Sequence, residues 1–190
     1  LPGLALRRRA DGGYTCASAD LAEHYLTVGS FKYFTKFFQL IRAAAKDIKI
    51  YPSAPTSYPG AWGNPRRWNA DNISPFEKMR VLNPPPSPLA IKRIRERLPF
   101  RVPQLAGVKL AETWAGMIDV TPDAVPTLNE DSKVKGLKIA TGLSGHGFGI
   151  GPAIGRITAD LVQGKSPGYD LSRFRATRFF DGSKIIPGPY

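Results

Sequence analysis

The sequence predicts an α+β fold that combines short strands with amphipathic helices. Three patterns predict it: a hairpin over residues 4–18, helical apolar spacing from Phe31 to Lys46, and a strand, a glycine-rich turn and a helix in succession over residues 136–162. Hydrophobic residues make up 42% of the 190 residues, including 10 Phe, 7 Tyr and 3 Trp. That much apolar surface can offset chain entropy, so a disordered chain is excluded.

The first element is a hairpin over residues 4–18. Leu4 and Leu6 occupy alternate positions before an Asp-Gly-Gly turn, and Tyr14 and Cys16 occupy alternate positions after it. Glycine tolerates the positive φ angles that tight turns need, so this spacing favours two antiparallel strands.

The clearest helix lies between Phe31 and Lys46. Its apolar positions recur every three or four residues, which is the period of one helix face; they are Phe31, Phe34, Phe37, Phe38, Ile41, Ala44 and Ala45. Ser30 precedes them and is the expected N-cap, because its hydroxyl can accept a backbone N–H of the first turn.

Residues 52–103 contain 11 prolines in 52 positions, which excludes long regular elements except a helix near residues 88–98. Such a stretch is either a low-complexity linker or an ordered, loop-rich insertion packed on a sheet. Trp62, Trp68 and Phe76 favour the insertion, because linkers rarely carry large apolar side chains.

The net charge is +12 and belongs to the first part of the chain. Residues 1–110 hold 18 cationic and 7 anionic side chains, whereas residues 111–190 hold 9 and 8. A basic module that binds nucleic acid or an acidic protein partner is therefore one candidate function. The alternative is an ordinary solvated helix face, because cations of residues 88–98 follow helical spacing around an apolar stripe; the stripe is Ile91, Ile94 and Leu98.

Two short strands are expected in the second half. Residues 108–118 place Val108, Leu110, Glu112 and Trp114 at alternate positions, which is the period of a strand. Lys138–Thr141 is the second candidate.

Cys16 is the single cysteine, which excludes an internal disulfide and any metal site built from several thiolates, so no metal is predicted. It indicates a reducing compartment, and we expect a cytoplasmic location. No apolar run approaches the roughly 18 residues needed to span a bilayer. Leu1 begins the chain without a methionine or a signal-like segment, and we expect a soluble piece of a longer protein.

The most informative segment is the strand, turn and helix over residues 136–162. Its turn and helix start leave the backbone bare at five glycines, which are Gly145, Gly147, Gly149, Gly151 and Gly155. Pro152 is tolerated because it falls in the expected first turn of the helix. Unpaired N–H groups and the positive end of the helix dipole favour a negative group of a ligand there. We expect a ligand that is flat, anionic or both.

A structural explanation of the same glycines stays open. The dinucleotide fingerprint Gly-x-Gly-x-x-Gly is not matched in any register of this segment, and no first strand opens the chain. The glycines could simply form a tight turn that lets helix and sheet pack closely.

Several segments together carry a more specific signal: residues 136–162, Trp114–Pro126, Ser74–Glu77, Arg80–Leu82, Phe174–Phe179 and Asp181–Ser183. In combination they resemble the C-terminal half of FAD-dependent oxidoreductases of the D-amino-acid oxidase superfamily. The nearest groups are the glycine oxidases, the sarcosine oxidases and the dye-linked proline or opine dehydrogenases. The resemblance covers nearly the whole chain.

This resemblance implies a division of the chain. Residues 1–135, including the insertion 52–103, would form an antiparallel or mixed-sheet substrate domain. Residues 136–165 would be the closing strand and helix of a GR2-type FAD-binding domain, and residues 166–190 an extended tail. The N-terminal Rossmann part, which holds the ADP portion of FAD, would be missing from these residues. It would be supplied by the rest of a longer chain or by a partner subunit, and neither nucleic acid nor a membrane span is then expected.

The resemblance also implies the cofactor contacts, which are Gly142, Ser144, Gly145, His146, Gly147, Phe148, Gly149 and Ile150. Their amides would face the pyrimidine end of the isoalloxazine, where negative charge gathers on reduction. The Thr121–Asp123 segment would close the same site from a neighbouring strand. His146 is the catalytic candidate: it either tunes the flavin or meets a substrate group, or it only packs on the ring.

The implied reaction oxidises a C–N bond of an amine or amino acid by hydride transfer to flavin. The substrate-binding candidates are Arg9, Tyr14, Trp114 and Met117. Members of the superfamily usually place a carboxylate-clamping arginine just after the Trp-x-Gly strand, where this sequence has Met117 and Ile118. Either Arg9 or Arg7 replaces that arginine, or the substrate lacks the carboxylate. A catalytically silent fragment is the remaining alternative.

Overall fold

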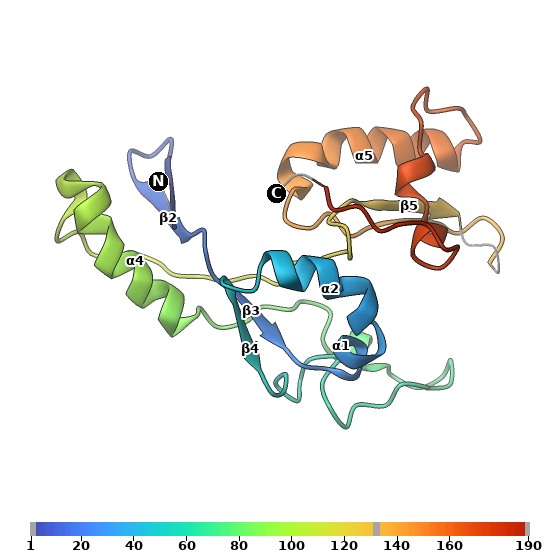
Figure 1. Cartoon of the computed structure of the whole chain (residues 1–190), viewed down its shortest axis with the longest axis horizontal. Coiled ribbons are helices and arrows are strands. Elements are labelled where there is room, and N and C mark those ends of the chain that lie inside the picture. Colours follow the sequence, from blue (N-terminus) through green and yellow to red (C-terminus); the bar gives the residue numbers. More distant parts are fainter. Residues whose placement is uncertain (1–2, 131–133, 189–190) are drawn as a thin grey trace. The chain divides into compact units, whose positions relative to one another are not determined.

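A computed structural model describes residues 3–130 and 134–188 (Figure 1). The chain divides into two compact units. The first unit is Leu1–Lys32 with Ala45–Met117, and the second is Tyr33–Ala44 with Ile118–Tyr190. In the described residues the strands form three sheets of two strands each, among helices of four to sixteen residues. This mixture confirms the predicted α+β class.

The described strands are short, with four or five residues each, and the longest described helices are α4 (Pro88–Arg101) and α5 (Gly147–Val162). The first unit contains β1 (Leu4–Arg8), β2 (Tyr14–Ser18), β3 (Ala22–Tyr25), α1 (Val28–Lys32), β4 (Ile48–Tyr51), α3 (Pro75–Lys78), α4 and the 3-10 turn η1 (Pro103–Leu105). The second unit contains α2 (Phe34–Ala43), β5 (Thr127–Glu130), β6 (Lys138–Thr141), α5, η2 (Ser172–Phe174) and η3 (Ala176–Phe179). Two sheets are antiparallel, β1 with β2 and β5 with β6, and the β3–β4 pair is parallel. Across the described residues, no helix has the length and apolar character needed to cross a membrane.

The predicted hairpin is confirmed. The Arg9 amide donates to the Gly13 carbonyl at 2.8 Å, and the Asp11 carboxylate accepts from the Gly13 amide at 2.9 Å. Gly12 has a φ of 85°, a value that side chains with a Cβ rarely adopt. The turn therefore forms where Gly12 allows a positive φ.

The expected single helix from Phe31 to Lys46 is wrong in its bounds. The structure has two helices, α1 and α2, separated at Tyr33, whose ψ of 11° departs from helical values. The expected N-cap, Ser30, is also wrong, because it lies inside α1. Its hydroxyl accepts the Thr27 amide at 3.0 Å, as the third helical residue does in a capping box, so Thr27 starts the helix three residues earlier.

The proline-rich residues 52–103 form ordered loops around a small aromatic cluster. Ala54, Tyr58 and Ala61 are buried together, and Tyr25 of β3 packs against them. The rings of Tyr25 and Tyr58 meet edge to face at 6.0 Å between centroids. This packing onto a strand is the arrangement of an insertion and not of a linker.

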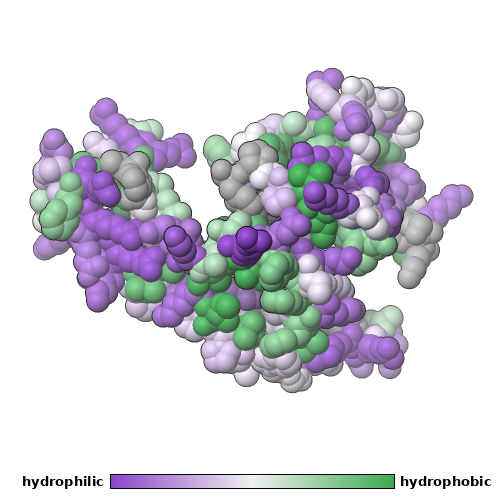
Figure 2. Space-filling view, in the orientation of Figure 1, coloured by the Kyte–Doolittle hydropathy of each residue, from purple (hydrophilic) through white to green (hydrophobic). Residues whose placement is uncertain are grey.

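Helix α4 is held against the hairpin by its cations. The Arg97 guanidinium donates to the Gly3 carbonyl at 2.9 Å and to the Asp20 carboxylate at 2.7 Å, and Arg93 donates to the Asp20 carbonyl at 3.0 Å. The interpretation of these cations as a solvated face is therefore wrong for Arg93 and Arg97. The solvated-face interpretation holds for Lys92, which is exposed. Hydrophilic residues cover much of the surface of the hairpin and α4 (Figure 2).

The expected strand over residues 108–118 is wrong. This segment is extended, but no strand pairs with it within residues 3–130 and 134–188. Its alternating sequence has the period of a strand, yet a strand also needs a neighbour for its backbone hydrogen bonds.

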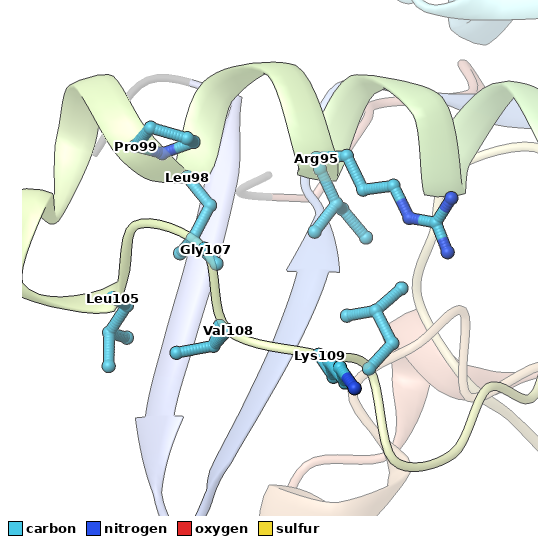
Figure 3. Close-up of a pocket in the computed structure, with 9 residues that line it drawn as sticks. Arg95, Leu98, Pro99, Leu105, Gly107, Val108 and Lys109 are labelled. Carbon is cyan, nitrogen blue, oxygen red and sulfur yellow. The ribbon is translucent and has the colours of Figure 1, made fainter.

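A groove of about 530 Å³ lies between α4 and the start of this extended segment (Figure 3). Its lining is apolar except for two cationic side chains, and it comprises Ile94, Arg95, Leu98, Pro99, Leu105, Gly107, Val108, Lys109 and Leu110. The groove therefore has a hydrophobic floor with positive charge beside it.

The ion pair between α4 and the hairpin predicts an acid-sensitive contact. Hydrogen bonding from Arg97 lowers the pKa of Asp20 from its ordinary value to about 2. Because the folded-state pKa is depressed, this contribution to stability is complete above about pH 4, the ordinary range of an Asp. It is lost as the pH falls towards 2. We expect wild type to withstand more urea than Asp20→Asn at pH 6, and the difference in unfolding midpoint to vanish near pH 2. A midpoint difference that is independent of pH would contradict this assignment.

Candidate functional site

The strand, glycine turn and helix expected near residue 142 are present in the second unit. Strand β6 enters the turn, and α5 begins at Gly147, immediately after His146. Within the turn, Ser144 and Gly145 have φ angles of 50° and 86°. The helix starts early enough that Pro152 lies in its second turn, so the expectation of a first-turn proline is wrong. The predicted succession of strand, glycine turn and helix is confirmed.

The start of α5 presents free backbone N–H groups. The amides of Gly149 and Ile150 donate to the His146 carbonyl at 3.0 and 3.2 Å. The amides of Gly147 and Phe148 make no hydrogen bond within the part of the chain that the structure describes. These two groups lie at the positive end of the helix dipole, where they can bind a negatively polarised group.

The glycines of this segment serve two different purposes. At Gly149, Gly151 and Gly155 an added Cβ would meet no heavy atom within 4 Å, so the backbone there lies open. At Gly142 an added Cβ would lie 2.2 Å from Cγ2 of Thr121, and the φ there is 70°. The glycines therefore differ in their surroundings. Gly142 packs closely on Thr121, and Gly147 would press on Leu143 at 3.0 Å if it carried a Cβ, whereas Gly149, Gly151 and Gly155 leave a bare surface.

The Thr121–Asp123 segment packs directly on the glycine turn. The Thr121 amide donates to the Ser144 hydroxyl at 3.2 Å, and that hydroxyl donates to the Gly142 carbonyl at 3.0 Å. Just upstream, the Asp119 carboxylate accepts the Gly142 amide at 2.7 Å, and the Asp119 carbonyl accepts the Ser144 amide at 3.0 Å. The turn is thus held on one side by two residues of a neighbouring extended segment.

A buried ion pair anchors this segment to the end of the chain. Asp123 and Arg178 are 3% and 6% exposed, and they form a bidentate pair at 2.8 and 3.0 Å. The guanidinium also donates to the carbonyls of Val125 at 2.7 Å and Arg175 at 2.9 Å, and it lies 4.1 Å from the centre of the Phe179 ring. Both charges are therefore hydrogen-bonded in place of water.

The same contacts set the ionisation of Asp123. Burial by itself would raise the pKa of Asp123, but hydrogen bonds from Arg178 and the Val125 amide, with the positive charge of Arg178, outweigh it. The net effect is a pKa below the ordinary value, so the carboxylate stays charged at neutral pH.

The expected substrate-binding residues all belong to the first unit. Arg9 is exposed and pairs with Asp11 at 2.8 Å across the hairpin turn, and Tyr14 begins β2. Trp114 and Met117 lie in the extended segment, and Trp114 is 58% exposed. Their role in substrate binding stays a prediction, as does that of the expected cofactor contacts.

His146 has a structural position at the start of α5. Its backbone amide donates to the Leu143 carbonyl at 2.8 Å, and its carbonyl caps the first turn. Its side chain is exposed and makes no capping hydrogen bond. The imidazole is therefore free to meet a ligand, and both interpretations of His146 remain open.

Sequence reasoning assigned no role to Asp119 or Arg178, although both lie in the segments that carry the family resemblance. Their side-chain partners are distant in the chain, since Asp119 accepts from Thr141, 22 residues away, and Arg178 pairs with Asp123, 55 residues away. No local pattern in the sequence marked either residue for these contacts.

Comparison with known proteins places the chain in a family. A family described as "DAO: FAD dependent oxidoreductase" matches residues 12–161. The chain therefore belongs to the DAO family of FAD-dependent oxidoreductases, and the predicted family and its cofactor, FAD, are confirmed.

Particular relatives match shorter stretches. Peroxisomal sarcosine oxidase of Homo sapiens is 35% identical over 86 residues, which are 45% of this chain and 21% of that protein. N-methyl-L-tryptophan oxidase of Citrobacter koseri is 56% identical over 41 residues, 22% of this chain and 11% of that protein. The structure of L-amino acid deaminase from Proteus vulgaris is 28% identical with a TM-score of 0.80, and the match covers 91% of this chain and 39% of that one. The chain spans about a fifth or less of these two curated relatives.

The buried ion pair predicts a large loss of stability when one partner is removed. Arg178→Met leaves the Asp123 carboxylate buried without its counter-charge, and breaking such a pair costs about 3–5 kcal/mol. We expect a large shift of the urea unfolding midpoint. The matched control is Arg175→Met, which removes an exposed pair with Asp181 and should shift the midpoint much less. Equal shifts in the two variants would contradict the role of burial.

The packing of Gly142 against Thr121 makes a second prediction. Gly142→Ala requires a side chain at a φ of 70° and within 2.2 Å of the Thr121 methyl group, and the left-handed backbone alone costs about 1–2 kcal/mol. The double variant with Thr121→Ser removes that methyl group and should recover part of the stability measured by urea unfolding. No recovery in the double variant would show that the close contact is unimportant.

Proposed function

We propose that this chain forms the substrate-binding portion and the isoalloxazine-contacting portion of a FAD-dependent enzyme that oxidises a C–N bond of an amine or amino acid. Family membership supports the cofactor and the class of reaction. The observation that carries the proposal is the start of α5, where free amides and an open glycine surface lie side by side.

The residues at the start of α5 fit a flat ring with a negatively polarised edge. The amides of Gly147 and Phe148 would donate to that edge, and the bare backbone at Gly149 would let the ring approach closely. Gly142, Ser144, Gly145 and Ile150 complete the set of proposed contacts. When bound, FAD supplies the acceptor for the hydride that leaves the substrate carbon.

Residues of the first unit would bind and orient the substrate. Trp114 and Tyr14 offer exposed aromatic surfaces, and Met117 offers an apolar one. Arg9 would have to exchange its Asp11 partner for a substrate carboxylate, whereas Arg7 is exposed and forms no ion pair within residues 3–130 and 134–188. Arg7 is therefore the more available of the two replacements for the usual clamp, unless the substrate has no carboxylate.

We propose His146 as a residue that contacts the flavin or substrate from the helix start. Hydride transfer depends on positioning more than on a strong base. An exposed imidazole there can donate a hydrogen bond or carry a positive charge.

The ADP portion of FAD would be held by polypeptide outside these 190 residues, either in the same chain or in a partner subunit. The sequence contains no Gly-x-Gly-x-x-Gly fingerprint in the glycine-rich segment, and the match to L-amino acid deaminase covers 39% of that protein. In this proposal, residues 136–165 are the closing strand and helix of the flavin-binding domain.

The test is the visible absorption spectrum of the purified chain, alone and co-expressed with the polypeptide encoded directly upstream. We expect a band near roughly 450 nm, as for any oxidised flavin, which appears with the upstream polypeptide and bleaches when an amine or amino acid is added. Absence of flavin from both preparations, together with nucleic-acid binding that weakens steeply with salt, would favour the basic binding module instead.

Gly149→Ala separates the flavin-contact role from a structural one. A Cβ there meets nothing in this chain, and replacing a helical glycine by alanine stabilises by about 0.5–1 kcal/mol. We therefore expect a fold at least as stable and a weaker retention of flavin in the co-expressed complex. Gly155→Ala is the matched control, because it is equally open but lies outside the proposed contacts. Equal flavin retention in wild type and both variants would remove the basis of this site.

A further inference from the structure

Residues 108–117 of the first unit have a strand sequence but no partner. From Lys109 to Ile118 no backbone hydrogen bond forms within the described residues, and no turn or bend interrupts the segment. Apolar side chains along it remain exposed, including Val108 and Trp114. An extended segment with unpaired N–H and C=O groups is a ready template for a further strand.

The strands that do pair each have only one neighbouring strand within the described residues. All three sheets in the described residues contain two strands, and a two-stranded sheet is only marginally stable unless further strands or a helix pack with it. The β3–β4 pair is parallel, an arrangement that is normally buried within larger sheets. The two-stranded sheets of this chain are therefore typical of fragments of larger sheets.

The surface area supports the same conclusion. The chain exposes 13774 Å², against about 9,000 Å² for a compact monomer of this mass and about 10,800 Å² for two separate compact proteins of half the mass. No large side chain among the described residues is fully buried. The excess of about 3,000 Å² is large even beside the roughly 2,000–5,000 Å² that a permanent interface buries over both partners together.

We propose that residues 108–117 pair as a β-strand with a strand of the polypeptide that supplies the rest of the FAD-binding enzyme. This inference rests on the proposed function for the identity of the partner. The chain covers 39% of the L-amino acid deaminase structure that it resembles, so most of such a protein has no counterpart here. A second copy of this chain is a poorer partner, because residues 1–110 carry 18 cationic against 7 anionic side chains and two copies would repel each other.

The groove beside the segment indicates the chemistry of the partner strand. Leu98 projects from α4 into the apolar floor, and Val108 and Lys109 line the groove from the extended segment (Figure 3). A partner strand that places one apolar side chain in this groove would fill it. Arg95 and Lys109 favour an acidic residue at the adjacent position.

The test is hydrogen exchange of the backbone amides of residues 109–117, followed residue by residue in the chain alone and in the preparation co-expressed with the upstream polypeptide. Pairing along one edge should slow every second amide by on the order of 100-fold, because alternate N–H groups of a strand point to opposite edges. Unchanged exchange in the co-expressed preparation would overturn the inference. Slower exchange in the chain alone that depends on its concentration would assign the segment to a second copy and would also overturn it.

Two proline variants provide the matched control. Ala111→Pro and Glu112→Pro remove neighbouring amides that point to opposite edges, and neither amide is hydrogen-bonded within the described residues of this chain. We expect one variant to lose co-purification with the upstream polypeptide and the other to retain it. Equal retention in both would overturn the inference.

Flavin absorbance of the same preparation distinguishes the two proposals. A complex that absorbs near roughly 450 nm without protection of residues 109–117 overturns the strand pairing and leaves the proposed function intact. Protection of alternate amides without bound flavin supports the pairing and overturns the proposed function.

Discussion

The buried pair between Asp123 and Arg178 determines the arrangement of the second unit. Two charges can be removed from water only when hydrogen bonds replace their hydration, and the guanidinium meets this condition with the carboxylate and two backbone carbonyls. The pair fixes the segment that begins at Thr121, and Thr121 in turn contacts Ser144. The shape of the glycine turn therefore depends on a residue near the end of the chain.

This dependence explains why the glycine-rich segment can combine a rigid turn with an open surface. Gly142 is locked between Thr121 and the Asp119 carboxylate, so the backbone there has little freedom. Further along, in α5, the backbone is open: a Cβ added at Gly149 or Gly155 would meet no heavy atom within 4 Å. A preorganised turn that ends in free amides is suited to stabilising charge that develops on a bound ring.

The first unit is organised by a different constraint, since its sheets lack neighbours. Asp20 joins α4 to the hairpin, and Tyr25 joins β3 to the proline-rich loops. These contacts order the loops without closing a large core. The unpaired extended segment and the large exposed area then have one explanation, which is that further strands complete these sheets.

The sequence by itself determined the elements whose causes are local. The hairpin follows from an Asp-Gly-Gly turn, and the existence of α5 follows from a glycine turn before helical apolar spacing, so both were predictable, although the first residue of α5 was not. Sequence patterns misplaced the helix start at Ser30, because α1 already begins at Val28 and Ser30 lies inside it. They also placed a strand at residues 108–118, since strand periodicity carries no information about whether a neighbour exists. Only the tertiary structure decided which distant charges meet, as with Arg178, because ion pairs between remote segments depend on how the chain folds back on itself.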